Sequence, residues 1–328
     1  MRRFLWLSLG ALLLAGMAVA SSGGATQAEA RWVVISLGTL GGKEGQANAI
    51  NNKGQVVGSA EVRVGVQHAF LWQKGRMVDL GTFGGAEGWA ADINERSQVV
   101  GLAATKAKDA EGEQVAHGFI WQNAHTTDLG AFSPAAINDR GQIAGWSRNE
   151  PSIWREGRVT GLGGLPSASS CFPNDINERA QIVGVCFADE MSHLHAVLWQ
   201  GGTARDLGSL GSAGATDVVI AINEQGQIVG ARNGRAFVWE KGKYRYLPTP
   251  KGKRTQAAGI NEQGQVAGWL LGDSIRAAVW QNGRMTLLPN LPGTSDSYAV
   301  AINDRHEIVG WSFEGGGARH AVLWTLKR

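Results

Sequence analysis

The stretch Ala49-Ile50-Asn51-Asn52-Lys53-Gly54-Gln55-Val56-Val57-Gly58 opens a unit that occurs seven times along the chain. Its Ile-Asn dipeptide recurs with the Asn at positions 51, 94, 138, 177, 223, 261 and 303. Each copy continues with a polar turn and a short apolar run that ends in Gly. Self-similarity at a nearly constant period of about 42 residues is typical of repeat architectures.

Two more apolar runs follow in six of the units, and one more follows in the seventh. The first ends in a tryptophan (Trp72, Trp121, Trp154, Trp199, Trp239, Trp280 and Trp324), and in six units the second resembles residues 77–81, Met-Val-Asp-Leu-Gly. The runs are short, rich in β-branched residues and bounded by Gly, Asn or Asp, which indicates β-strands. No segment shows sustained helical periodicity. Four strands in a repeat of this length predict one blade of a β-propeller.

The two ends of the chain predict that the ring of blades closes. The seventh unit stops four residues after Trp324 and lacks a fourth strand, whereas residues 33–42 match residues 77–85 without a unit before them. An N-terminal strand that completes the last blade removes exposed sheet edges. An open solenoid would need atypical capping units, and none is visible in the sequence. We therefore predict an all-β fold, a single seven-bladed β-propeller domain over residues 31–328, with four-stranded antiparallel blades and closure by the N-terminal strand.

Residues 1–30 have the pattern of a targeting segment. A basic start (Arg2, Arg3) precedes an apolar run that ends at Ala20, and small residues recur up to Ala30. This predicts a secretory signal peptide cleaved after Ala20 or Ala30, with an uncleaved anchor as the alternative. No second run of spanning length follows. We expect a secreted monomer, extracellular or periplasmic, with no membrane span in the mature chain.

Composition excludes several classes of function. Charged residues make up 18% of the chain and the formal net charge is +3, so neither a disordered tail nor a nucleic-acid binder is indicated. The sequence contains no phosphate-binding Gly loop, zinc-protease His motif, Gly-x-Ser-x-Gly elbow or calcium loop. It therefore predicts no cofactor, no metal site and no identifiable catalytic residue.

The units are similar to the HAF repeat of secreted, mostly bacterial proteins. The likeness rests on residues 68–72 (His-Ala-Phe-Leu-Trp) with Ala-Ile-Asn at 49–51 and Asp-Leu-Gly at 79–81, and it covers nearly all of residues 31–328. The third and sixth units depart most from the His-Ala-Phe pattern. The resemblance implies an extracellular repeat protein and supplies no catalytic residues.

A polar residue stands four positions before each repeated Trp: His68, His117, Glu150, His195, Arg235, Arg276 and His320. These side chains could form a ring of ligand contacts, but a residue repeated once per blade more often holds its own blade together. The mixture of His, Glu and Arg is a poor shared metal site, because a guanidinium does not ligate metals. The candidate binding residues, weighed against this architectural interpretation, are Trp89, Glu87, His68, His117, His195, His320, Arg235 and Arg276.

Other repeated residues are predicted to be structural. The seven repeated Trp side chains should pack between blades, and the repeated Asn should bond turn backbone groups. Ser97, Ala180 and His306 replace a turn Gly expected in the left-handed conformation, so these turns should be strained or differently built. Cys171 and Cys186 flank one hairpin and are predicted to form a disulfide.

The expected functional face carries the variable loops and one mouth of the channel, since function tends to lie on variable loops of a rigid scaffold. The favoured hypothesis is a secreted, non-catalytic propeller that binds an extracellular protein or glycan partner there. The alternative is a secreted polysaccharide lyase or hydrolase with its site at the channel mouth. A mainly structural surface component is the third hypothesis. Charged candidates for the enzyme are Glu44, Glu87, Asp189, Glu190, Asp217 and Asp296.

Overall fold

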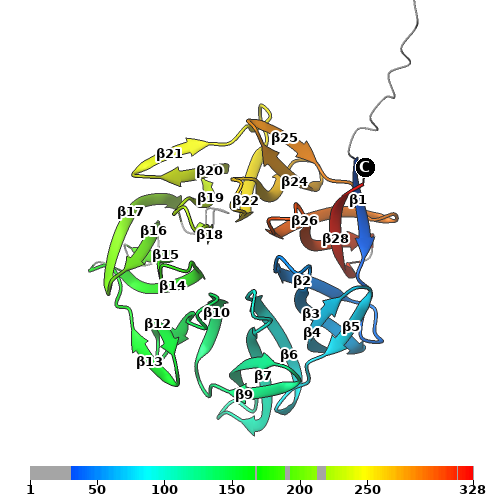
Figure 1. Ribbon diagram of the computed structural model, residues 1–328, viewed down its shortest axis with the longest axis vertical. Helices are drawn as coiled ribbons and strands as arrows, with labels where there is room; N and C mark the ends of the chain where they lie inside the picture. Colours follow the sequence, from blue (N-terminus) through cyan, green and yellow to red (C-terminus); the bar gives the residue numbers. More distant parts are fainter. Residues whose placement is uncertain (1–30, 167, 189–192, 213–218, 316, 328) are drawn as a thin grey trace, which may run out of the picture.

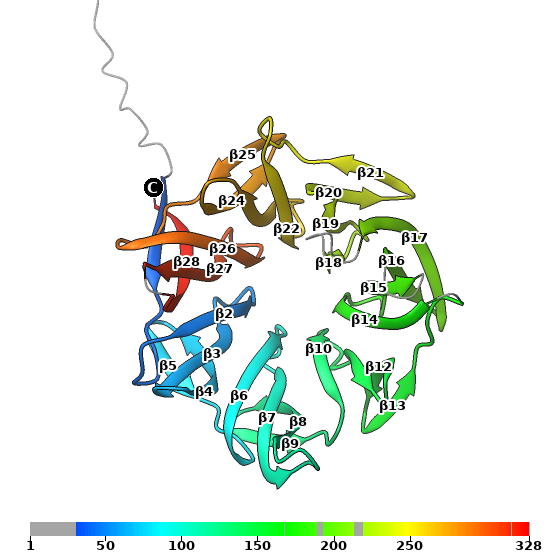
Figure 2. The same cartoon turned by 180° about the vertical axis from the view of Figure 1, so that it is seen from behind.

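The computed structural model describes residues 31–166, 168–188, 193–212, 219–315 and 317–327. In these residues the chain forms seven four-stranded antiparallel sheets arranged as blades around a central channel (Figures 1 and 2). The predicted all-β, seven-bladed propeller is confirmed.

Blades 1 to 6 take their four strands in chain order from the channel outward, and blade 7 takes three in chain order followed by the N-terminal strand. Blade 1 contains β2 (Gly45–Ile50), β3 (Val56–Arg63), β4 (Val66–Gln73) and β5 (Arg76–Asp79), and blade 2 contains β6 (Gly84–Ile93), β7 (Val99–Lys108), β8 (Gln114–Gln122) and β9 (His125–Asp128). Blade 3 contains β10 (Ser133–Ile137), β11 (Ile143–Ser147), β12 (Glu150–Arg155) and β13 (Arg158–Gly161), and blade 4 contains β14 (Ala168–Ile176), β15 (Ile182–Ala188), β16 (His193–Gln200) and β17 (Thr203–Ser212). Blade 5 contains β18 (Val219–Ile222), β19 (Ile228–Arg232), β20 (Arg235–Glu240) and β21 (Lys243–Tyr246), and blade 6 contains β22 (Arg254–Ile260), β23 (Val266–Leu271), β24 (Ile275–Gln281) and β25 (Arg284–Leu287). Blade 7 contains β26 (Thr294–Ile302), β27 (Ile308–Glu314), β28 (Arg319–Lys327) and the N-terminal strand β1 (Arg31–Ser36).

The ring closes as the sequence predicts. Strand β1 pairs antiparallel with β28 over its whole length, from Arg31 opposite Lys327 to Ser36 opposite Val322. The N-terminal and C-terminal segments therefore share one sheet, which Figure 1 shows as the blue strand β1 beside the red strand β28. Because β1 supplies the fourth strand, blade 7 has four strands like the other six blades.

A β-bulge interrupts the innermost strand of every blade, two residues before its repeated Ile. Beside the bulge, the main chain of this strand lies close to the Gly at the third position of the next strand. A Cβ at Gly58 would lie 2.0 Å from the carbonyl oxygen of Gln46, and one at Gly310 would lie 1.8 Å from that of Tyr298. A Cβ at this position would clash with the main chain of the innermost strand, which explains why the second apolar run of each unit ends in Gly.

The core lies between the blades. Seven apolar clusters occur among the described residues, one at each interface of neighbouring blades. At the interface of blades 6 and 7, Val34 of β1 packs against the cluster that contains Trp324. The indole N–H of Trp324 also donates to the carbonyl of Pro289 in the preceding connection, at 2.7 Å. Equivalent bonds run from Trp199 to Gly163 and from Trp280 to Pro248, so these repeated Trp side chains pack between blades as predicted.

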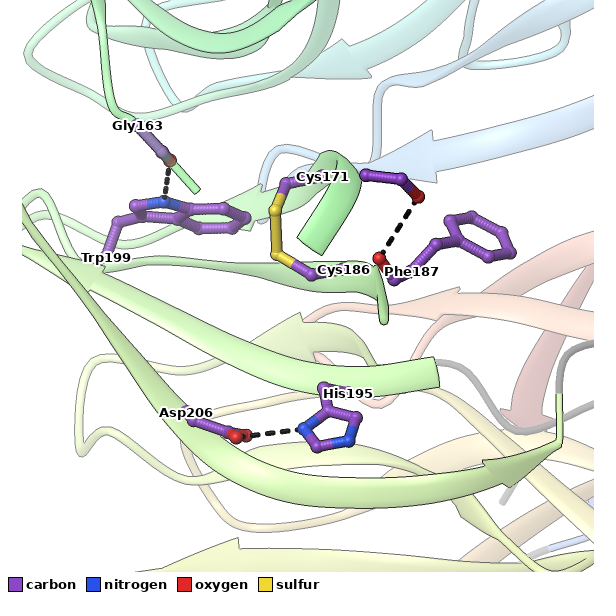
Figure 3. Close-up of a disulfide and its surroundings, with 8 residues drawn as sticks. Gly163, Cys171, Cys186, Phe187, His195, Trp199 and Asp206 are labelled. Carbon is purple, nitrogen blue, oxygen red and sulfur yellow. Dashed lines mark hydrogen bonds and ion pairs between the residues drawn. A yellow bond between two sulfur atoms is a disulfide. The ribbon is translucent and has the colours of Figure 1, made fainter. Parts of the chain in front are cut away.

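The disulfide Cys171–Cys186 is present in blade 4, where the two residues lie directly opposite on β14 and β15 (Figure 3). The hairpin pairs Ile176 with Ile182, and the bulge between Pro173 and Asp175 then shifts the register by one residue. That shift places the two sulfur atoms opposite each other. The inner-strand bulge therefore completes the pairing that the sequence predicts.

No helix long and apolar enough to cross a membrane occurs in the described part of the chain. The predicted signal peptide, residues 1–30, lies outside the described residues.

Candidate functional site

The central channel is bounded at one end by the hairpin turns that contain the repeated Asn. The amide oxygen of each Asn accepts bonds from its own turn, as those from Lys53 and Gln55 to Asn51 show. The sequence predicts this bonding of the repeated Asn to the main chain of its own turn. The amide nitrogen also donates to the Asn carbonyl of the next blade, over 2.9–3.2 Å, in an unbroken circle through Asn51, Asn94, Asn138, Asn177, Asn223, Asn261 and Asn303. All seven side chains are buried, so this Asn belt joins every blade to the next.

A second circle lies beside the Asn belt and carries charge. The residue after each repeated Asn accepts, through its side-chain oxygen, a bond from the main-chain N–H of the same position in the preceding blade. Six of the seven members are carboxylates. This carboxylate ring consists of Asn52, Glu95, Asp139, Glu178, Glu224, Glu262 and Asp304. Six carboxylates therefore lie at one mouth of the channel, beside five cations of the same turns: Lys53, Arg96, Arg140, Arg179 and Arg305.

The carboxylates of the ring affect one another. Burial raises the pKa of Glu95, Glu178 and Glu262, and the charge of a neighbouring carboxylate raises each of them further. Hydrogen bonds from main-chain N–H groups oppose these effects. The charges of Lys53, Arg140 and Arg179 also lower these pKa values, so cations of the same turns already relieve part of the repulsion.

The channel wall is built mainly from small side chains. The bulge residues and their successors line a cavity of about 210 Å³ that all seven blades share. Asp92 and Asp175 are its two carboxylates. Each accepts the N–H of its own following Ile and that of the next blade's Ile, at 2.7–2.8 Å. Burial raises the pKa of Asp92 to about 6, and burial together with the charge of Asp92 raises that of Asp175 to about 8.

Aromatic rings gather on the strand ends away from the Asn turns. Phe172 and Tyr298 stand five residues before the Asn of their blades, which puts them about 15 Å along the strand from the turn. Phe172 stacks on Trp146 of the preceding blade, with ring centroids 5.6 Å apart. Tyr298 stacks on Trp311 at 5.5 Å and also meets Trp269 of the preceding blade. The channel strands are thus acidic toward one end and aromatic toward the other.

The polar residues four positions before the repeated Trp lie on the third strand of each blade, and they contact other residues of the same blade. Nδ1 of His68, His117 and His195 lies 2.9–3.0 Å from an aspartate on the fourth strand (Asp79, Asp128 and Asp206), as Figure 3 shows for His195. His320 lies 3.5 Å from Glu314, and Arg235 lies over the ring of Tyr246 at 4.8 Å. Arg276 donates to the carbonyl of Leu288. These contacts agree with the architectural interpretation, and the structure does not bring the seven side chains together at one site.

Trp89 and Glu87 do lie at one place. Trp89 is 39% exposed and, with Glu87 and Glu113, lines a surface cavity of about 220 Å³. The sequence predicts that Trp89 lies in a connection between blades, and this prediction is wrong. It lies inside the innermost strand β6, because the strand begins at Gly84, and a ligand role for it remains a prediction.

The acid candidates for the polysaccharide-cleaving alternative are spread over the molecule. The main-chain N–H of Glu44 donates to Glu61, Asp296 accepts from the N–H of Ile275, and Glu87 lines the Trp89 cavity. Asp189, Glu190 and Asp217 lie outside the described residues. No group of three or more His, Cys, Asp or Glu side chains suited to a metal ion occurs in the described ranges.

Sequence reasoning missed the carboxylate ring and the channel aspartates. The signal was present, because the residue after the repeated Asn is acidic in six of seven units. The contacts of this acidic residue depend on the neighbouring blade, however. A turn carboxylate is ordinarily solvated, and only the packing of adjacent turns shows that these side chains form a circle.

The fold and the channel define a closed seven-bladed β-propeller. No family model and no curated protein sequence matches the chain. Among solved structures it is similar to the β-propeller domain of the Trilobed protease from Pyrococcus furiosus, with a TM-score of 0.60, 11% identity and coverage of 87% of this chain and 97% of that one. It is also similar to Pyrococcus horikoshii acylaminoacyl peptidase (TM-score 0.53, 8% identity) and to puromycin hydrolase (TM-score 0.59, 11% identity). The chain covers 51% and 52% of those two, and 86% of its own length is covered in each case.

These comparisons correct the functional expectation. The sequence favours a secreted non-catalytic propeller that binds a protein or glycan, with a polysaccharide lyase or hydrolase as the alternative. The similar structures are instead those of a protease propeller domain, an acylaminoacyl peptidase and a puromycin hydrolase. At this level of identity the likeness establishes the shared fold. The HAF resemblance is untested by these comparisons and stays a prediction.

Proposed function

We propose that this chain is the propeller component of a peptidase-type hydrolytic system, and that its central channel receives the positively charged end of an extended peptide. The observation that carries the proposal is the carboxylate ring at the mouth of a channel with small side chains along its wall. The similarity to propellers of peptidases supports the same class of substrate.

The ring is suited to an amino terminus or a lysine or arginine side chain. The six carboxylates at this opening can pair with a positively charged group of a ligand, although five cations of the same turns offset part of their charge. The small Ala and Gly residues of the wall leave a cavity of about 210 Å³. Inside it, Asp92 is the more ionised of the two channel carboxylates near neutral pH, because the pKa of Asp175 is raised further, to about 8.

The proposal assigns binding and access to the propeller and leaves the peptide-cleaving groups to a hydrolase that works with it. The chain spans about half the length of the two peptidases to which it is similar. We also infer that this system works outside the cytoplasm. The disulfide Cys171–Cys186, the targeting pattern of residues 1–30 and the HAF resemblance support that location.

The test measures binding of fluorescent ten-residue peptides to the purified protein by anisotropy. A peptide with a free amino terminus and two lysines should bind at least ten-fold more tightly than an acetylated peptide with two glutamates. The preference should shrink at high salt, because the attraction is electrostatic. Mass spectrometry of the same mixtures reports whether the peptide is cleaved.

Matched variants locate the binding. Glu95→Gln with Glu224→Gln keeps the side-chain oxygens that accept main-chain bonds but removes two charges, and it should weaken the lysine peptide at least five-fold. Glu111→Gln, an exposed change in the loop between β7 and β8, serves as the control. Equal binding of the two peptides, or a double variant that binds like the parent, would overturn the proposal.

A further inference from the structure

In three blades a histidine on the third strand faces an aspartate on the fourth, eleven residues later. The pairs are His68–Asp79, His117–Asp128 and His195–Asp206. Each aspartate also accepts, at 2.7 Å, the N–H of the Gly two residues further on. The pair therefore connects the two outer strands and the turn that follows them.

Blade 6 has an arginine at the position of the histidine and no aspartate to pair with it. Arg276 takes the place of the histidine, and Leu287, eleven residues later, takes the place of the aspartate. The registers are the same, since Leu287 lies opposite Ala278 as Asp79 lies opposite Phe70. One Nη of Arg276 donates to the carbonyl of Leu288 at 3.3 Å. Its Nε is buried and has no hydrogen-bond partner within the described ranges.

Blade 5 shows that a change of this kind can be compensated. There Arg235 replaces the histidine, and Tyr246 replaces the aspartate. The guanidinium of Arg235 lies 4.8 Å from the centroid of the Tyr246 ring, a cation–π contact. Leu287 has neither a negative charge nor an aromatic ring with which Arg276 could interact. A buried donor without an acceptor costs stability, so this guanidinium is available for an external acceptor.

Arg276 faces a cavity of about 480 Å³ between blade 6 and the closing strand β1, which are neighbours in the ring (Figure 1). Strand β1 contributes a second guanidinium, Arg31, and the indole of Trp32. The remaining lining residues are Thr286, Leu287, Leu288 and Pro289. The cavity thus combines two cations with an apolar wall, and Leu287 is 40% exposed there. Among the residues that the structure describes, its lining contains no carboxylate.

We propose that this cavity is a binding site for a small organic carboxylate that carries an aromatic or branched aliphatic group. The carboxylate takes the place of the missing aspartate and pairs with Arg276 and Arg31, since a guanidinium matches the geometry of a carboxylate. The apolar group lies against Trp32 and Leu287. The volume is within the range of small-molecule sites, about 300–1,000 Å³. The site is separate from the channel and does not depend on the function proposed for it.

The test uses 3-phenylpropionate as the probe and isothermal titration calorimetry with the purified protein. The wild type should bind it saturably, and the neutral analogue 3-phenylpropionamide should bind at least ten-fold more weakly. Inorganic phosphate serves as a second arm. If phosphate binds as tightly as the carboxylate, the site recognises charge alone, and the assignment to an apolar carboxylate is wrong.

Two variants separate ligand binding from a structural role. Arg276→Gln should weaken binding at least ten-fold, while Arg235→Gln, the matched change in blade 5, should leave it unaltered. Leu287→Asp restores the internal partner found in blades 1, 2 and 4. It should abolish binding of the probe and at the same time raise the midpoint temperature of unfolding. Loss of binding together with a lower midpoint, probe binding unchanged in Leu287→Asp, or no binding to the wild type would overturn the proposal.

Discussion

The side-chain amide of Asn303 donates a 3.0 Å hydrogen bond to the main-chain carbonyl of Asn51, 252 residues earlier in the chain. This bond closes the Asn belt at the interface of blades 7 and 1, the closing interface, whereas β1 closes the ring within blade 7 by pairing with β28. Closure thus has two independent parts, a strand at the outer edge of the blade and a buried amide beside the channel. The first two predictions test these parts separately.

Asn303→Ala should destabilise the whole ring. The change removes three or more bonds of a buried side chain and leaves the carbonyl of Asn51 without this donor, a loss of about 1–3 kcal/mol in the free energy of unfolding. Urea unfolding followed by tryptophan fluorescence measures it. Asn138→Ala, away from the closing interface, should lose a similar amount, and Lys251→Ala, on an exposed turn, should lose almost none. An unaffected Asn303→Ala protein would contradict a structural belt.

Loss of strand β1 should destabilise the propeller strongly, because it exposes the edge of β28 and uncovers the apolar cluster around Trp324. Deletion of residues 31–36 from the mature protein tests the strand, with thermal unfolding as the measurement. Val34→Ala is the milder variant and should cost about 1–2 kcal/mol through lost burial. A truncated protein that melts like its parent would show that the Asn belt suffices for closure.

The disulfide should contribute modestly to stability. It closes a 15-residue separation, for which the chain-entropy model gives up to about 3 kcal/mol. Unfolding of the wild type with and without reductant, and of the Cys171→Ala/Cys186→Ala double variant, measures the effect. Free thiols detected in the native, unreduced protein would rule the bridge out.

The channel aspartates should make the fold less stable as pH rises. The folded-state pKa is about 6 for Asp92 and about 8 for Asp175, against 3.8 as the ordinary value. The native state therefore holds protons that the unfolded chain releases. Its stability falls between pH 4 and 6 through Asp92 and between pH 4 and 8 through Asp175, by at most about 1.4 kcal/mol per pH unit for each group. Other carboxylates with a raised or a lowered pKa also contribute, so the comparison is with Asp175→Asn. That variant should lose less stability than the wild type between pH 5 and 8. An identical pH dependence in both proteins would refute the assignment.

One turn can be stabilised by a single substitution. Ala180 holds a left-handed conformation with φ of 54°, at the place where Gly141 and three other turns have glycine. A residue with a Cβ pays about 1–2 kcal/mol for that conformation. Ala180→Gly should therefore raise the free energy of unfolding by up to about 1 kcal/mol, part of the gain being offset by the flexibility of glycine in the unfolded chain. The reciprocal change Gly141→Ala should lower it, and equal signs for the two variants would contradict the explanation.

Much of the architecture follows from the sequence alone. The Ile-Asn repeat, the Gly after the second run and the orphan residues 33–42 predict seven blades and their closure, because each blade is a local hairpin structure with its own pattern. The Cys171–Cys186 pair is predictable for the same reason, since both residues belong to one hairpin. Periodicity and turn chemistry act over a few residues, and the sequence displays them directly.

Only the tertiary structure decides where chemistry can occur. The carboxylate ring exists because each turn packs against the next blade's turn, and the bond between Glu95 and Asn52 joins positions 43 residues apart. The spacing of Arg276 and Leu287 is visible in the sequence, but the cavity they share with Arg31 requires the first strand to reach the last blades. A side chain's charge is written in the sequence. Whether that charge is solvated, paired or left facing a cavity depends on which distant segments fold against it.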